Sequence, residues 1–172
     1  MTASRLLAVA CVSWIVGGCA APAVASAPAP ATAPIAGRYG ATVSRIFDLI
    51  NAERRHQGLP ALVYNAKLDE MAKIQAQNMA HFQKMAHVIS EASLPTLADR
   101  ARYVAYPFGR IAENVALGYP DSETVVQGWM TSNGHRANIL NSEVVETGIG
   151  IARSSSGGIY YCQVFGRRLS SR

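Results

Sequence analysis

Residues 65–86 read NAKLDEMAKIQAQNMAHFQKMA, and this stretch decides the fold class. Apolar side chains recur in it at the three- and four-residue spacing of one helix face, and they are Leu68, Met71, Ala72, Ala76, Met79, Phe82 and Ala86. Asn65 stands directly before the first turn and is a good N-cap residue. The pattern predicts an amphipathic helix from Ala66 to about Ala86, packed along one side on a core.

One further helix is expected before this stretch and two are expected after it. Residues 42–57 carry one apolar stripe that ends at Gly58, a common helix stop. Residues 94–106 fit a shorter helix. Asp121 is placed to cap a helix that runs to about Met130.

The last third of the chain changes from helical patterns to β-strand patterns. Residues 147–153 and 159–165 are β-prone, and the turn-forming sequence SSSGG separates them, so they predict a hairpin. Residues 111–118 supply a third strand. We therefore expect an α+β fold in which helices pack on a small antiparallel sheet.

Composition excludes several classes of protein. The chain has 172 residues with 16 basic and 11 acidic side chains, a net charge of +5 without long runs of like charge, so nucleic acid is not expected as a partner. Cys11, Cys19 and Cys162 are too few and too widely spaced for a disulfide framework or a cysteine-based zinc site. The two-residue alternation of the last strand predicts that Cys162 is a buried, unreactive side chain and not a nucleophile.

The N-terminus predicts export. Residues 1–18 contain Arg5 and then a short apolar run that cannot span a bilayer, as in a signal peptide. VGGC at 16–19 resembles a bacterial lipobox and predicts lipidation of Cys19; the alternative is ordinary cleavage after the AVA sequence at 23–25. Residues 19–41 then form an Ala/Pro-rich linker and residues 42–172 the globular domain. The expected location is extracytoplasmic, on a membrane through the lipid, at the outer membrane or facing the periplasm.

Polar residues that could carry chemistry interrupt this scaffold. His87 falls at the edge of the apolar face at the end of the long helix, whereas His81 falls on the opposite, solvent side. Glu113 lies in an apolar strand, where it could simply pair with Arg110 or with a backbone amide. His135 follows the fourth helix. Taken alone, a residue such as His87 or Glu113 in such a position more often has a structural role than a functional one.

Taken together, several motifs resemble the CAP superfamily, also called SCP or cysteine-rich secretory protein-like domains, and its bacterial branch in particular. They occur in the order of the family between Thr42 and Gly166. The motifs are LINAER at 49–54, GLPAL at 58–62, MAH at 85–87, ENVA at 113–116, WMTS at 129–132, GHRANIL at 134–140 and YYCQVFG at 160–166.

The resemblance implies a three-layer α-β-α sandwich whose central cleft gathers His87, Glu113 and His135. Ser132 stands where many eukaryotic members have a fourth, acidic residue, so a complete four-ligand site is absent. Two histidines and one glutamate are still a recognised donor set for catalytic zinc, and magnesium is the other candidate metal. The metal-binding prediction is therefore His87, Glu113 and His135, with Ser132 beside them in the cleft.

Two functions of different classes follow from this sequence. The preferred interpretation is a lipid-anchored binding module that presents the cleft to a cell-envelope ligand, because one acidic residue is missing. The alternative is a metal-assisted hydrolase acting on peptide, glycan or ester bonds of the envelope. Ser132 lies near His135 but has no nucleophile-elbow motif around it. Lipid carriage would need an apolar groove that the sequence does not distinguish from the core.

Lipidation at Cys19 can be tested by metabolic labelling with a fatty acid. We expect label in the wild-type chain, which should be found in the membrane fraction, and none in a Cys19→Ala variant. Absence of label from both chains would contradict the anchor.

Overall fold

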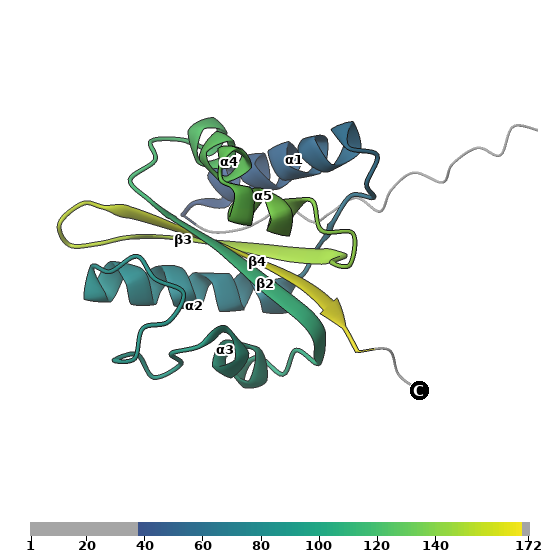
Figure 1. The fold of residues 1–172 in the computed structure, drawn as a ribbon. Coiled ribbons are helices and arrows are strands. Elements are labelled where there is room, and N and C mark those ends of the chain that lie inside the picture. The colour runs from purple at the N-terminus through teal and green to yellow at the C-terminus, as the bar shows by residue number, and fades with distance from the viewer. Residues whose placement is uncertain (1–37, 170–172) are drawn as a thin grey trace, which may run out of the picture. The chain divides into compact units, whose positions relative to one another are not determined.

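Figure 1 shows the computed structural model of the protein, in which residues 38–169 are described. The predicted signal peptide, the predicted lipidation site Cys19 and the predicted linker up to residue 37 lie outside the described residues. In chain order the elements are α1 (Gly40–His56), β1 (Val63–Tyr64), α2 (Ala66–Phe82), α3 (Leu97–Tyr103), β2 (Phe108–Leu117), α4 (Ser122–Thr131), α5 (Asn133–Ile139), β3 (Glu146–Arg153) and β4 (Ile159–Arg168). Helix α1 thus begins two residues before the expected start at Thr42.

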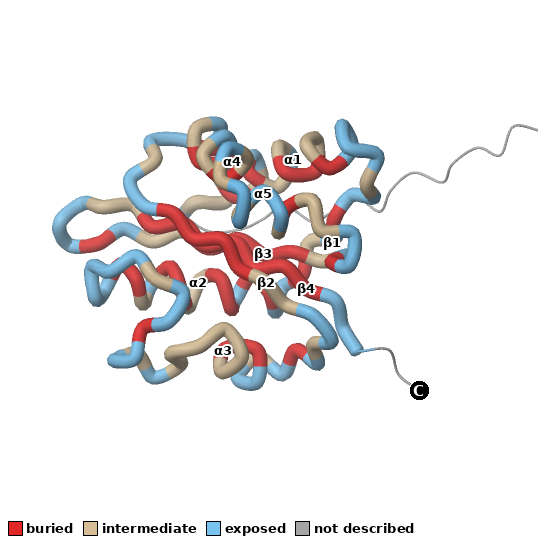
Figure 2. Tube along the Cα trace, viewed as in Figure 1, coloured by how far each residue is buried: buried red, intermediate tan, exposed pale blue. Residues whose placement is uncertain are grey.

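The described chain forms three layers, as expected. A four-stranded sheet of order β1-β3-β4-β2 lies between α1, α4 and α5 on one face and α2 and α3 on the other (Figure 1). The predicted β3–β4 hairpin and the β2–β4 pair are antiparallel, and the short strand β1 adds a parallel pair with β3. Burial is concentrated in the strands and on the helix faces turned toward them (Figure 2). Cys162 is buried on the α2 side of the sheet, as predicted.

The long helix ends earlier than its apolar pattern suggested. Asn65 caps α2 as expected, accepting hydrogen bonds from the backbone N–H groups of Lys67 and Leu68. At Gln83, however, the backbone turns left-handed, with φ 50°, so the chain leaves the helix and folds back beside it. The Gln75 side chain then donates to the Ala86 carbonyl at 2.5 Å. His87 therefore lies in the loop after α2, and its predicted place at the end of the helix is wrong.

Three other elements differ from the prediction because little apolar pattern marks them. The helix expected over residues 94–106 is only Leu97–Tyr103, and it begins at a capping box formed by Thr96 and Asp99. The seven-residue helix α5 was not predicted, since only Ile139 within it is buried. Strand β1 has two residues, too few to show an alternation.

Glycines let α2 lie unusually close to the sheet. A methyl group at Gly148 would overlap the backbone at Asp69, and one at Gly150 would overlap the backbone at Ala72. Both glycines lie on β3, so this strand has no side chain between itself and α2 there. The close approach fixes α2 against the centre of the sheet.

Arg54 joins the α1 layer to the chain entering β3. Arg54 is 1% exposed, and its side chain faces four backbone carbonyl groups. The guanidinium donates to Pro60 at 2.9 Å, Ile139 at 2.7 Å, Asn141 at 2.9 Å and Val144 at 3.5 Å. One side chain thus satisfies carbonyl groups from the turn after α1, the end of α5 and the following loop.

Replacing this side chain should destabilise the fold strongly. We expect Arg54→Met to keep apolar volume but leave the carbonyl groups without a donor, lowering the free energy of unfolding by about 3 kcal/mol. The control is Arg55→Met, at the exposed neighbouring position of the same helix, which should change it by less than about 0.5 kcal/mol. Urea unfolding measures both, and equal stability of the two variants would contradict the role of Arg54.

Candidate functional site

The candidate site is built on a buried carboxylate, Glu113 of β2. Its side chain is 3% exposed, and Arg100 of α3, which is fully buried, donates to its Oε2 at 2.6 Å. The thiol of Cys162 lies 3.4 Å from the same oxygen. The sequence-based pairing of Glu113 with Arg110 is wrong, because Arg110 extends to Glu143 at the surface, 2.7 Å away.

Arg100 is the residue that sequence reasoning missed. It follows Leu97 by three residues and precedes Ala101 and Val104, so it lies within the apolar stripe of its helix. A charged residue within such a stripe is the signal that could have identified a buried ion pair. With Arg100 beneath it, the carboxylate is paired and its other oxygen remains for His87.

His87 comes from the loop after α2 and lies at the surface above Glu113. Its Nδ1 is 3.0 Å from Oε1 of Glu113, and its side chain is 56% exposed. The hydrogen bond to this carboxylate raises the pKa of His87 above 6.5, against the opposing effects of partial burial and of Arg100. Because Nδ1 faces the carboxylate, Nε2 is the ring nitrogen free for a ligand.

His135 lies on α5, on the opposite face of the sheet, yet the two histidines belong to one region. Strand β2 is at the edge of the sheet, so side chains from both helical layers can approach each other beyond it. Burial lowers the pKa of His135 below 6.5, and the positive charge of a protonated His87 lowers it further. The structure therefore brings His87 to Glu113 by a direct contact, and His135 lines the same cavity as Met85, two residues before His87.

The side chains that could act as nucleophiles are not activated. Ser132 ends α4 and precedes α5, half-buried, and within residues 38–169 its hydroxyl makes no hydrogen bond to another group. Burial raises the pKa of the Cys162 thiol, and the charge of Glu113 raises it further. Both observations disfavour covalent catalysis by these residues.

A small apolar cavity of about 190 Å³ adjoins His135. Its lining combines the outer part of β2 with α4 and the loop after α2, and consists of Met85, Val115, Ala116, Leu117, Tyr119, Gly128, Trp129 and His135. The sequence motifs included most of these residues, but nothing in them separated a cavity wall from the core. The candidate site thus has a polar part at the histidines and an apolar part beside them.

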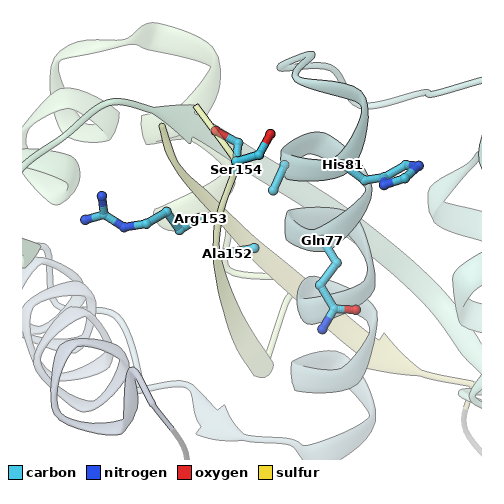
Figure 3. Close-up of a pocket in the computed structure, with 7 residues that line it drawn as sticks. Gln77, His81, Ala152, Arg153 and Ser154 are labelled. Atoms are coloured by element: carbon cyan, nitrogen blue, oxygen red, sulfur yellow. The ribbon is translucent and has the colours of Figure 1, made fainter. Parts of the chain in front are cut away.

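A second cavity, of about 300 Å³, lies between the C-terminal part of α2 and the β3–β4 turn. Its lining includes Gln77, His81, Arg153 and Ser154, shown in Figure 3. In that view the imidazole of His81 and the guanidinium of Arg153 point away from each other, so these two groups do not converge on one ligand there (Figure 3). His81 is exposed, as predicted.

The predicted metal ligands can be tested against this geometry. Both oxygens of Glu113 already meet partners, one of them the guanidinium of Arg100, so the residue fits the carboxylate partner of a ligating histidine better than a ligand. Over the described range 38–169, no three His, Cys, Asp or Glu side chains are grouped to hold one ion. A metal held by the two imidazoles fits the donor chemistry; the three-ligand set stays a prediction.

Comparison with known proteins identifies the family. The model of the Cysteine-rich secretory protein family, CAP, matches residues 47–165, and the chain belongs to this family. YkwD, an uncharacterized protein of Bacillus subtilis, is 32% identical over 123 residues, which are 72% of this chain and 46% of YkwD. The matched part of this chain therefore spans about half the length of YkwD.

Solved structures agree with this assignment. An extracellular SCP-domain protein from Bacillus anthracis is 30% identical with a TM-score of 0.66, covering 74% of this chain and 41% of its own. An outer surface protein from Borrelia burgdorferi shares the fold, with 19% identity and a TM-score of 0.70. The match covers 76% of this chain and 96% of that protein. NaASP2, solved with Zn²⁺, is 12% identical with a TM-score of 0.52 over 73% of this chain and 78% of its own.

The two histidines should titrate on opposite sides of their ordinary pKa of 6.5. Protonated His87 donates a hydrogen bond to Glu113, and this bond stabilises the folded protein. The stabilisation is fully present below pH 6.5 and is lost as the pH rises through the raised pKa of His87. Burial of His135 disfavours its protonation, so stability falls as the pH drops below 6.5. Imidazole NMR titration in metal-free buffer measures both pKa values.

A variant separates the causes of these shifts. His87→Ala should raise the pKa of His135 only in part, because burial is the larger cause and remains. His81→Ala, at an exposed position on α2, is the control and should leave that pKa unchanged. An unchanged His135 titration in the His87 variant would contradict the proximity of the two rings.

Proposed function

We propose that this CAP-family chain is an extracytoplasmic, lipid-anchored protein that binds a cell-envelope ligand at the cleft of His87, Glu113, Ser132 and His135. Its export and its anchor at Cys19 rest on the N-terminal sequence. The extracellular nature of the Bacillus anthracis SCP-domain protein supports an extracytoplasmic location. No helix within residues 38–169 is long and apolar enough to cross a membrane.

One observation carries the binding function: the carboxylate of the cleft, Glu113, is already paired with its neighbours. Glu113 is buried and held by Arg100, and its remaining oxygen orients His87. A carboxylate held in this way fixes the imidazole toward the surface, where it can contact a ligand. Beside it the cavity of about 190 Å³ offers apolar contact, so the arrangement suits recognition of a ligand with polar and apolar parts.

The metal-assisted hydrolase is the second candidate, favoured by the orientation of His87. Its Nδ1 faces a carboxylate, which is the usual arrangement of a histidine that binds metal through Nε2. His87 and His135 would then hold the ion, with Glu113 as the outer partner. A bound zinc or magnesium ion would supply Lewis acidity and an activated water. The fold of NaASP2, solved with Zn²⁺, makes zinc the first metal to test.

Co-sedimentation with insoluble envelope material tests the binding function. The full chain with Cys19→Ala should be used, so that retention does not reflect the lipid. We expect the chain with an unchanged cleft to sediment with the envelope material. His87→Ala or His135→Ala should weaken this binding about tenfold or more, the scale of losing one polar partner. His81→Ala should bind like the parent chain.

The same samples distinguish the two candidates. Release of soluble fragments from peptidoglycan, protein or ester substrates, with zinc or magnesium added, would favour the hydrolase if it disappears in both histidine variants. Retention that none of the variants changes would contradict binding at this cleft.

A further inference from the structure

The outer edge of β2 has no strand beside it among the described residues, and its last part, at Leu117, is open to pairing. Among the described residues β2 has one neighbouring strand, β4. The N–H of Gly118 donates to the Ile159 carbonyl at 2.9 Å, so in this antiparallel register the even-numbered residues of β2 pair with β4. The backbone groups of Glu113, Val115 and Leu117 consequently point outward.

Two side-chain contacts support this direction independently. The indole Nε1 of Trp129 donates to the Val115 carbonyl at 3.3 Å, and Nδ2 of Asn138 donates to the Glu113 carbonyl at 3.2 Å. Side chains therefore cover the outward carbonyl groups on the first part of the edge. At Leu117, within the part of the chain that the structure describes, no such group covers the N–H or the C=O.

The apolar cavity adjoins this uncovered part of the edge. Val115 and Leu117 line it together with Met85 and Trp129, which come from the layers on either side. At about 30 Å³ for each water in the liquid, 190 Å³ corresponds to about six non-hydrogen atoms, the size of one aliphatic or aromatic side chain. An unpaired edge beside a pocket of this size is the arrangement by which proteins add a peptide as an extra strand.

The charges around the cleft favour an acidic occupant. Lys84 lies in the loop after α2, and Arg136 follows His135 on α5; both are exposed. Lys84 forms a long, exposed ion pair with Glu91, with 3.9 Å between the charged atoms. Arg136 forms no ion pair within residues 38–169. Glu113 offers little repulsion, because it is buried against Arg100.

We propose that the edge of β2 from Val115 to Leu117 binds an extended acidic peptide as an added strand, with one aliphatic side chain of the peptide in the cavity. This inference rests on the proposed binding function and names the chemical class of the ligand. Leu117, which is 40% exposed, supplies both a donor and an acceptor. The N–H of Val115 points to the same side but lies deeper, since that residue is 5% exposed. The alternating backbone contacts give affinity, and the cavity selects the side chain.

The probe is acetyl-Glu-Val-Leu-Val-Glu-amide, titrated against the full chain by isothermal calorimetry and by amide NMR. We expect saturable binding that shifts the Val115 and Leu117 amide signals. Two further probes carry N-methyl groups, either on the Leu nitrogen or on both Val nitrogens. Because only alternate N–H groups of a strand face its neighbour, one N-methylated peptide should lose about tenfold or more in affinity and the other less than about threefold.

A matched pair of protein variants tests the same contact from the other side. Leu117→Pro removes an N–H that points away from β4, a position where an edge strand tolerates proline. This variant should bind the probe with about tenfold lower affinity, whereas Leu117→Ala, which keeps the N–H, should lose less than about threefold in affinity. Circular dichroism checks folding, and the N-methylated probes decide the question if the proline variant does not fold.

Four results would overturn the inference. They are no binding by any probe, equal binding of both N-methylated probes, equal or tighter binding when Lys replaces Glu in the probe, and binding that requires deletion of residues 19–37. The third would exclude the acidic class, and the fourth would indicate that the linker of this chain occupies the edge. Envelope co-sedimentation measured in parallel separates the proposals, since retention without peptide binding overturns this inference alone.

Discussion

The buried ion pair between Glu113 and Arg100 is the constraint on which the candidate site depends. Each side chain is almost completely removed from water, and their closest atoms are 2.6 Å apart. Burying two charges costs several kcal/mol for each ion, and only close pairing with further hydrogen bonds offsets that cost. Glu113 meets this condition through His87 as well as Arg100. An apolar pair would fill the same volume, but it could not orient an imidazole at the surface, so the charge here serves the site more clearly than it serves stability.

The sequence predicted the fold where periodic patterns are long and failed where tertiary contacts decide. The apolar stripe after Asn65 and the hairpin around residues 154–158 gave the right elements, because their patterns span several turns or alternations. The end of α2 was missed because the left-handed backbone at Gln83 and the return of Ala86 to Gln75 involve polar groups without a periodic signal. Helix α5 was missed for a related reason, since it buries a single residue.

Prediction of the site depended on the family motifs more than on the local pattern. The motifs identified His87, Glu113 and His135 on three separate segments, and the direct contact of the first two agrees with a common location. The partner of Glu113 was wrong because Arg110 is close in sequence, whereas Arg100 is brought close by the packing of α3 on β2. The cavity was beyond prediction for a similar reason: its walls come from two layers that meet only beyond the edge of the sheet.

The position of β4 in the sheet has a consequence for the order of folding. This strand pairs with both β2 and β3, although it follows every other described helix and strand along the chain. Strand β2 therefore has no sheet partner, and α2 lacks part of the surface it covers, until β4 is available. Such contacts between distant segments slow the search for the native state. During synthesis β2 would therefore stay without a strand partner until β4 has emerged, which is compatible with export before folding.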